Sequence, residues 1–137
     1  MKVFISHAEA DEELAKRIAD TLQNAGLEVW DHRREILPGD NWADKVAQAL
    51  RESNAMVVLL TPAALHSSWV RREIEYALGQ KTYSKRLIPV LVGPPEEISE
   101  DDVPWILRYL NMIRLTKPEQ KKNLKEITEA LLAVAEA

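Results

Sequence analysis

The sequence predicts an α/β fold of the flavodoxin-like, doubly wound type: a parallel five-stranded sheet with strand order 2-1-3-4-5 and helices on both faces. Short apolar runs alternate with segments of helical spacing five times along the chain. Each connection between successive strands is also long enough for the crossover that parallel pairing requires. The 137 residues are expected to form a single domain, residues 1–137, that buries its core without disulfides.

The first part of the chain supplies three of the strands. Residues 3–6 are a short apolar run without helical spacing, which predicts a buried strand, and residues 27–31 form the second. Residues 55–61 are almost entirely apolar, as expected for a central parallel strand that is covered on both faces. Between the first two strands a helix is expected to end at Gly26. Its apolar face is Leu14, Ile18, Leu22 and Ala25.

A loop and a second helix separate the second strand from the third. The loop contains the dipeptide Pro38-Gly39, which is typical of a turn. Asp40 or Asn41 then provides the N-cap of the helix. The apolar face of this helix is predicted to be Trp42, Val46, Ala49 and Leu50.

The helix that follows the third strand combines an aromatic and an acidic residue. Ser67 or Ser68 can accept a hydrogen bond from its first free backbone N–H groups, as N-cap serines do. Trp69 and Glu73 are four residues apart, so they point into the same space. Taken alone, a glutamate beside arginines on an amphipathic helix is usually a solvated surface charge. The predicted buried stripe is Val70, Ile74, Ala77 and Leu78.

The last third of the chain completes the sheet. Residues 87–92 are the fourth strand, in which Pro89 lacks an N–H group and predicts weak pairing or a bulge. A short helix is expected over residues 104–110, and a brief strand over residues 112–115. The last helix is expected to start near Lys117-Pro118. Its apolar side is Leu124, Ile127, Leu131 and Val134.

Composition and motifs exclude several function classes. The net charge of -4 argues against nucleic acid as the main partner, and the lack of cysteine excludes disulfides and thiolate metal sites. The N-terminus does not resemble a secretory signal and no apolar run is long enough to span a bilayer, so we expect a cytoplasmic protein without a membrane partner. The glycine-rich, Walker and G-x-S-x-G motifs are absent. His7, His32 and His66 lack metal-ligand spacing.

The predicted topology places the Trp69/Glu73 helix next to the expected ligand site. In doubly wound sheets, ligands bind beyond the carboxyl ends of the strands. The first strand ends at Ser6-His7 and the second at Asp31-His32, and the helix starts just after the third strand. From the residues alone, Ser6 and His7 are interpreted as strand-end hydrogen-bonding groups.

With these elements placed, the sequence resembles a Toll/interleukin receptor (TIR) domain of the NAD-cleaving bacterial type over nearly its whole length. Residues 4–7 resemble the first-strand box of that family, and residues 31–42 resemble its BB loop. Residues 60–62 followed by residues 68–74 resemble the Trp-x-x-x-Glu segment of enzymatic members. Many bacterial and plant members of the family cleave NAD at the nicotinamide–ribose bond, whereas animal receptors and adaptors act as assembly modules.

The resemblance implies that Glu73 is catalytic and that NAD is a substrate, with no cofactor. Nicotinamide leaves NAD as a neutral molecule, so the reaction needs support for an oxocarbenium-like sugar, which one carboxylate can supply. Glu73 would stabilise that charge, hold ribose hydroxyls or attack the anomeric carbon. Its place near a helix start is expected to favour the ionised form slightly. Trp69 would stack on a pyridinium or adenine ring, for about 0.5–2 kcal/mol.

The resemblance also assigns further contacts. Trp42 would either close over the substrate or begin the apolar stripe of its own helix. Arg33 and Arg34 would contact phosphate or a neighbouring subunit. The complete set of substrate contacts implied in this way is Trp69, Ser6, His7, Trp42, Arg33, Arg34 and Asp31.

Two functions of different classes follow. The first is an NAD glycohydrolase or ADP-ribosyl cyclase that releases nicotinamide and ADP-ribose or a cyclic isomer in defence signalling. The second is a non-catalytic module that associates with other TIR domains through its BB loop. The pairing of Trp69 with Glu73 favours the enzyme, because an adaptor has no need of that pair beside a cleft.

Overall fold

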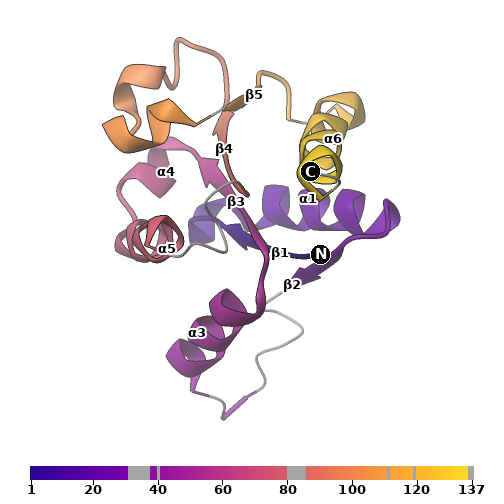
Figure 1. The fold of residues 1–137 in the computed structure, drawn as a ribbon. Helices are drawn as coiled ribbons and strands as arrows, with labels where there is room; N and C mark the ends of the chain where they lie inside the picture. The colour runs from indigo at the N-terminus through magenta and orange to yellow at the C-terminus, as the bar shows by residue number, and fades with distance from the viewer. Residues whose placement is uncertain (31–37, 40, 80–85, 111, 119, 136–137) are drawn as a thin grey trace.

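The computed structural model describes residues 1–30, 38–39, 41–79, 86–110, 112–118 and 120–135 (Figure 1). Within these ranges five strands form one sheet, paired in parallel throughout, in the order β2-β1-β3-β4-β5. The predicted fold class and strand order are therefore confirmed. The strands are β1 (Lys2–Ser6), β2 (Glu28–Trp30), β3 (Ala55–Leu60), β4 (Leu87–Val92) and β5 (Ile113–Leu115).

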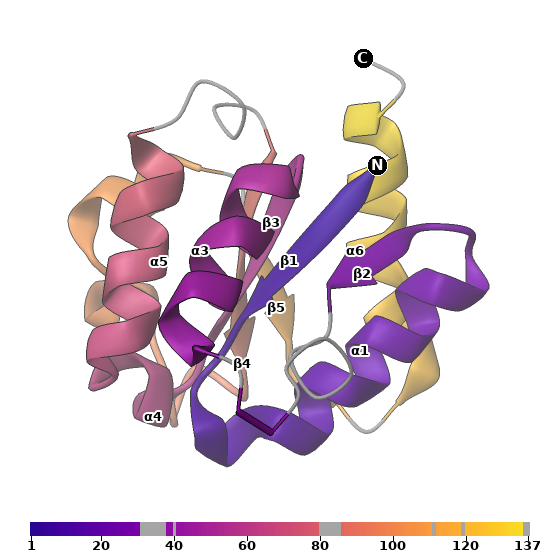
Figure 2. The ribbon, with the colours of Figure 1, turned by 90° about the horizontal axis from the view of Figure 1, so that it is seen from below.

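Helices cover both faces of the sheet, as Figures 1 and 2 show. α1 (Glu12–Asn24) and α6 (Lys121–Ala135) pack on one face, and α3 (Trp42–Glu52) and α5 (Ser68–Leu78) pack on the other. β3 serves both layers, because all six of its residues are buried and successive side chains point to opposite faces. Met56, Val58 and Leu60 join the α3/α5 cluster, whereas Ala55, Val57 and Leu59 join the α1/α6 cluster.

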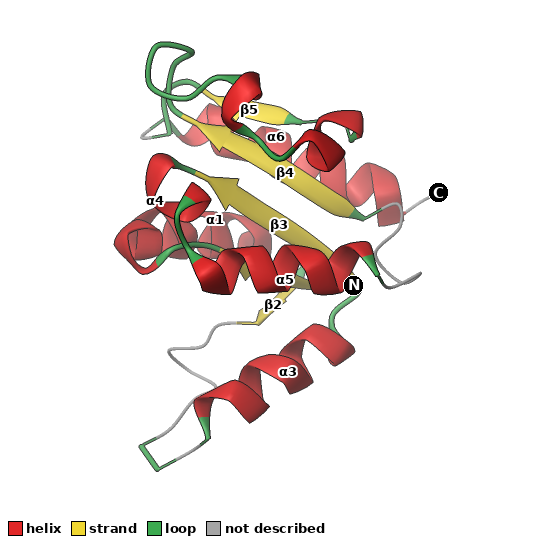
Figure 3. Ribbon diagram, turned by 90° about the vertical axis from the view of Figure 1, so that its left-hand side faces the viewer, coloured by secondary structure: helices red, strands yellow, loops and turns green. Residues whose placement is uncertain are grey.

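Short helical segments lie at the ends of the strands. In Figure 3, β3 points toward α4, and α5 then turns back along the sheet. Local signals explain α4: the Thr61 hydroxyl accepts a hydrogen bond from the Ala64 N–H at 3.1 Å, and Pro62 occupies the first turn. The short helix expected over residues 104–110 is present as the 3-10 helix η4 (Trp105–Tyr109). Within the described ranges, the short helical segments that were not predicted are α4 (Pro62–Leu65), η1 (Glu9–Asp11) and η3 (Glu100–Asp102).

Two predicted apolar positions are exposed. Leu78 is 40% exposed, so its place in the buried stripe is wrong. Each step of four residues turns the side chain about 40° around an α-helix, which carries Leu78 about 80° from the direction of Val70. Ala25 is exposed because α1 ends at Asn24 and the chain turns at Gly26, whose φ is 92°. Gly26 thus ends this helix as predicted.

The fourth strand contradicts the expected effect of its proline. The register between β3 and β4 runs without interruption from Met56↔Leu87 to Leu60↔Leu91, with Pro89 opposite Val58. The bulge expected at Pro89 is therefore wrong. β5 pairs with β4 only over Val90–Val92, so Pro89 lies outside that second ladder and a donor toward β5 is not needed there.

Helix starts also differ in part from expectation. Of the two candidate N-caps for α3, Asn41 is the observed one: its side-chain oxygen accepts from the Asp44 N–H at 3.2 Å. α6 begins at Lys121, a few residues after the predicted start. Its predicted apolar face is buried at Leu124, Ile127 and Leu131, while the side chain of Val134 lies outside the described part of the chain.

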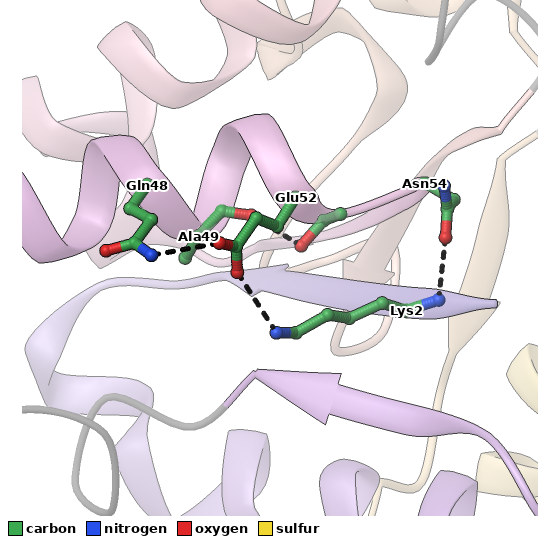
Figure 4. A network of polar contacts seen from close by, with 6 residues as sticks. Lys2, Gln48, Ala49, Glu52 and Asn54 are labelled. Carbon is green, nitrogen blue, oxygen red and sulfur yellow. Dashed lines mark hydrogen bonds and ion pairs between the residues drawn. The ribbon is translucent and has the colours of Figure 1, made fainter.

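Polar contacts hold the start of β1 (Figure 4). The Lys2 N–H donates to Asn54 Oδ1 at 3.0 Å, and Lys2 Nζ lies 3.5 Å from Glu52 Oε2. Gln48 donates to the other Glu52 oxygen at 2.9 Å, and this hydrogen bond is the main cause of the lowered pKa of Glu52. The contacts join β1 to the end of α3 and so steady the strand whose far end leads into the site described below.

None of the helices in the described ranges combines the length and apolar character needed to cross a bilayer.

Candidate active site

A pocket of about 450 Å³ opens beyond the carboxyl ends of β1 and β2. This is where ligands bind in doubly wound sheets. A larger groove of about 640 Å³ lies between α1 and α6, away from the strand ends and from Glu73. Position and chemistry therefore single out the smaller pocket, which is lined by Phe4, Ile5, His7, Glu9, Glu12, Trp30, Val46, Trp69 and Glu73.

The start of α5 brings Trp69 and Glu73 to this pocket. Ser67, rather than Ser68, is the N-cap, and its hydroxyl accepts a hydrogen bond from the Val70 N–H at 3.2 Å. With the helix begun in this way, Val70 and Ile74 are buried in the core. Trp69 and Glu73 both line the pocket, as their spacing of four residues predicts.

Glu73 is buried and bound to the first strand. It is only 8% exposed, so the interpretation of this residue as a solvated surface charge is wrong. The Ser6 hydroxyl, itself fully buried, donates to Glu73 Oε1 at 2.7 Å. Ser6 thus acts as a strand-end hydrogen-bonding group, and it lies behind Glu73 rather than on the pocket lining.

Burial raises the pKa of Glu73 to about 7, and the hydrogen bond from Ser6 acts in the opposite direction. The expectation that the helix start would favour the ionised form is therefore wrong in its net effect. Glu73 is the sixth residue of α5 and lies beyond its first turn, where the partial positive charge of the helix N-terminus has largely fallen off, so the removal of the carboxylate from water decides the direction of the shift. The Glu73 carboxyl consequently titrates near neutral pH.

Trp69 is the exposed aromatic side chain of the pocket. It is 37% exposed, and the guanidinium carbon of Arg72 lies 5.9 Å from the centroid of its ring. This is the geometry of a cation–π contact. The indole thus already stacks with one planar cation of the protein, and its side chain also lines the pocket.

The loop after β1 adds two acids that the sequence analysis did not single out. Glu9 comes from η1 and Glu12 from the start of α1, and both line the pocket together with His7. The Thr61 hydroxyl donates to Asp11 and ties η1 to the end of β3. The signal was available, since the loop after the first strand must lie at the ligand-binding edge of the sheet.

The floor of the pocket is aromatic. Phe4 and Trp30 stack with their ring centroids 5.4 Å apart and their planes at 15°. Nδ1 of His7 lies 3.3 Å from the carbonyl oxygen of Ile5, which keeps the ring close to its own strand end. The described lining therefore offers aromatic faces and three carboxyl groups, and none of its residues is a lysine or an arginine.

Four of the predicted contacts cannot be placed. Asp31, Arg33 and Arg34 lie outside the described residues, and so does the side chain of Trp42, although its backbone begins α3. The structure brings together His7, Trp69 and Glu73, with Ser6 directly behind. Among the described residues, no group of three histidine, cysteine, aspartate or glutamate side chains could hold a metal ion.

A model of the TIR domain family matches residues 3–131. This chain belongs to the TIR domain family. The match includes Ser6 of β1 and Glu73 of α5, and therefore both residues of the hydrogen bond that joins these elements.

Relatives of this TIR domain carry different names. A stimulator of interferon genes protein from Magallana gigas is 31% identical over 131 residues, which cover 93% of this chain and 30% of that protein. A 2' cyclic ADP-D-ribose synthase from Bacteroides thetaiotaomicron is 28% identical over 86 residues, 62% of this chain and 30% of its own. An NAD(+) hydrolase from Paracoccus denitrificans is 27% identical over 134 residues, 96% of this chain and 43% of its own. This chain therefore spans less than half of the length of each of these three relatives.

Solved structures agree on the fold. The TIR-STING receptor from C. gigas in complex with 2',3'-cGAMP superposes with a TM-score of 0.78 at 30% identity, covering 94% of this TIR domain and 38% of that chain. The TIR domain of a Toll-related receptor from Hydra magnipapillata gives a TM-score of 0.70 at 21% identity, covering 96% and 94%. The second likeness concerns the fold alone.

Proposed function

We propose that this TIR domain cleaves NAD at the nicotinamide–ribose bond and releases nicotinamide with ADP-ribose or a cyclic isomer of it. The observation that carries this proposal is the buried Glu73 carboxyl, which lines a pocket beside the exposed indole of Trp69. Relatives named NAD(+) hydrolase and 2' cyclic ADP-D-ribose synthase support it. In chemical class the domain would be an NAD nucleosidase or ADP-ribosyl cyclase.

The chemistry requires one anionic group. The bond between the anomeric carbon and the pyridinium nitrogen breaks, and its electron pair neutralises the departing ring. Positive charge then develops on the ribose, where the Glu73 carboxylate stabilises it or bonds to the carbon transiently. Water, or a nucleophilic atom of the same ADP-ribose, completes the reaction and loses its proton. The carboxyl group must be ionised for this role.

A buried acid in this place also argues against a purely structural site. Burial penalises the ionised form of Glu73 and so raises its pKa. A scaffold gains nothing from this penalty, whereas perturbed acids in pockets are typical of functional sites. The charge balance of the pocket further suits the cationic nicotinamide end of NAD, since Glu9, Glu12 and Glu73 line it.

The diphosphate of NAD then needs positive charge from elsewhere, and Arg33 and Arg34 come shortly after β2 in the sequence. Replacing both with alanine is expected to raise the KM for NAD about tenfold, because charge-assisted hydrogen bonds to phosphate are lost, with little change in kcat. Initial rates over a range of NAD concentrations measure this. Lys121→Ala, on the distant α6, is the control. If the double arginine variant and the Lys121→Ala variant had equal KM values, Arg33 and Arg34 would not contact the substrate.

Trp69→Ala is expected to raise KM about 2- to 30-fold, because the stacking surface for the planar ring is lost. Trp69→Phe keeps an aromatic face and is expected to retain most of the affinity. The same steady-state kinetics measure both variants. If alanine and phenylalanine had the same effect, Trp69 would serve helix packing rather than substrate binding.

The direct test incubates concentrated wild-type protein with NAD and separates the products by chromatography. Nicotinamide should appear together with ADP-ribose or a cyclic isomer in equal amounts. A series of protein concentrations is required, because we also propose that the domain associates with other TIR domains in cytoplasmic defence signalling. Absence of nicotinamide at every concentration would leave the second candidate, a non-catalytic assembly module.

A further inference from the structure

The contact between Ser6 and Glu73 joins two elements that are far apart in the sequence. Ser6 is the last residue of β1, and its backbone is held in register opposite Val58 of β3. Side chains at positions two apart on a strand point the same way, so Ser6 shares the face of Phe4, which packs in the α3/α5 cluster. This places the Ser6 hydroxyl under α5, 2.7 Å from Glu73 Oε1.

We propose that Ser6 is a positioning residue: its hydroxyl holds one carboxyl oxygen of Glu73 from behind, so that Oε2 is the oxygen presented to the ribose. Ser6 is fully buried and does not line the pocket, which separates this role from the substrate contact that the family resemblance implies. The role in turnover rests on the proposed NAD cleavage, whereas the effect on Glu73 itself does not.

The surroundings of Glu73 explain why a donor is needed at this place. The other titratable groups that line the same pocket are Glu9 of η1, Glu12 of α1 and His7, and the causes that act on the pKa of Glu73 are its burial and the hydrogen bond from Ser6. From β2 and α3 the lining residues are Trp30 and Val46, which carry no charge. The hydrogen bond from Ser6 favours the ionised form against burial.

A neutral hydroxyl suits this task better than a lysine or arginine would. It stabilises the carboxylate by a hydrogen bond and leaves its charge uncompensated, so the charge remains available to a developing cation in the pocket. A buried ammonium or guanidinium group would pair with Glu73 and weaken its attraction for the ribose. Because a neutral donor offsets burial only in part, removing it should raise the pKa of Glu73 further.

The first experiment measures Glu73 directly, without NAD. The carboxyl carbon is followed by NMR during a pH titration of 13C-glutamate-labelled protein, and Glu73→Gln assigns the signal. The Ser6→Ala variant is expected to titrate about one pH unit above the wild type, because the ionised carboxylate loses a hydrogen bond that stabilises it more than it stabilises the protonated form. Ser6→Thr keeps the hydroxyl and should titrate close to the wild type. An unchanged midpoint in Ser6→Ala overturns the inference.

The second experiment follows NAD cleavage as a function of pH. In Ser6→Ala the rising limb of kcat should move to higher pH by the same amount, so that the loss is about fivefold or more at pH 7 and small at pH 9. KM should hardly change. An equal loss at all pH values would indicate a merely structural role, and a raised KM with an unmoved pH profile would make Ser6 a substrate contact; either result overturns the inference.

The two experiments also separate this inference from the proposed function. If Ser6→Ala shifts the titration of Glu73 but the wild type releases no nicotinamide, NAD cleavage is refuted while the hydrogen bond retains its effect on Glu73. Thermal unfolding establishes that each variant is folded. Should Ser6→Ala fail to fold, Ser6→Cys, which keeps a weaker donor of similar size, is expected to show a smaller shift in the same direction.

Discussion

Glu73→Gln lowers the rate of NAD cleavage by about 100- to 1000-fold at pH 8, the loss expected when a principal group that stabilises transition-state charge is removed. Glutamine has nearly the same size and can still accept the hydrogen bond from Ser6. The substitution therefore removes the negative charge while the packing of α5 on β1 is retained. Nicotinamide release, measured by chromatography at saturating NAD, gives the ratio of rates.

Glu75→Gln is the matched control, because Glu75 lies on the same helix with an exposed side chain. Its rate should equal that of the wild type. If Glu73→Gln and Glu75→Gln release nicotinamide equally fast, Glu73 has no role in the chemistry, and assembly with other TIR domains becomes the better function.

The stability of the Glu73→Gln variant relative to that of the wild type is also expected to increase as the pH rises. Burial raises the pKa of Glu73 from 4.5 to about 7. Between these values the folded wild type binds more protons than the unfolded chain, so its stability falls as the pH increases through this window. The full loss, reached above pH 7, is about 3 kcal/mol. Glutamine does not titrate, so the Glu73→Gln variant does not undergo this loss of stability.

Denaturant unfolding of both proteins at pH 4.5 and pH 8 measures this effect. Titrating groups that the two proteins share cancel in the difference between their free energies of unfolding. That difference should shift by about 3 kcal/mol in favour of Glu73→Gln between the two pH values. Glu75→Gln should show no such shift. If Glu73→Gln also shows none, the carboxyl group is not buried as the structure has it.

The two expectations together describe a conflict between stability and activity at one residue. The charge that would support a developing cation is the charge that burial penalises. Residues of this kind persist where function requires them, and their replacement commonly stabilises a protein while it removes activity. A Glu73→Gln variant that is both inactive and more stable at pH 8 would be difficult to explain for a scaffold.

Patterns along the chain were sufficient for the architecture. The apolar run of β3, the turn at Gly26 and the serine at the start of α5 are local signals, and each is found where it was predicted. The spacing of Trp69 and Glu73 likewise determined that they share one direction from the helix. Such features depend on the backbone geometry of a single element, which neighbouring residues set.

Only the tertiary structure decided the environment of the site. The donor to Glu73 is Ser6, 67 positions earlier in the sequence, and the acids Glu9 of η1 and Glu12 of α1 reach the pocket from a segment with no distinctive motif. The raised pKa of Glu73 follows from this environment. A sequence pattern tells which face of an element a side chain occupies, whereas burial and pKa depend on what other elements place against that face.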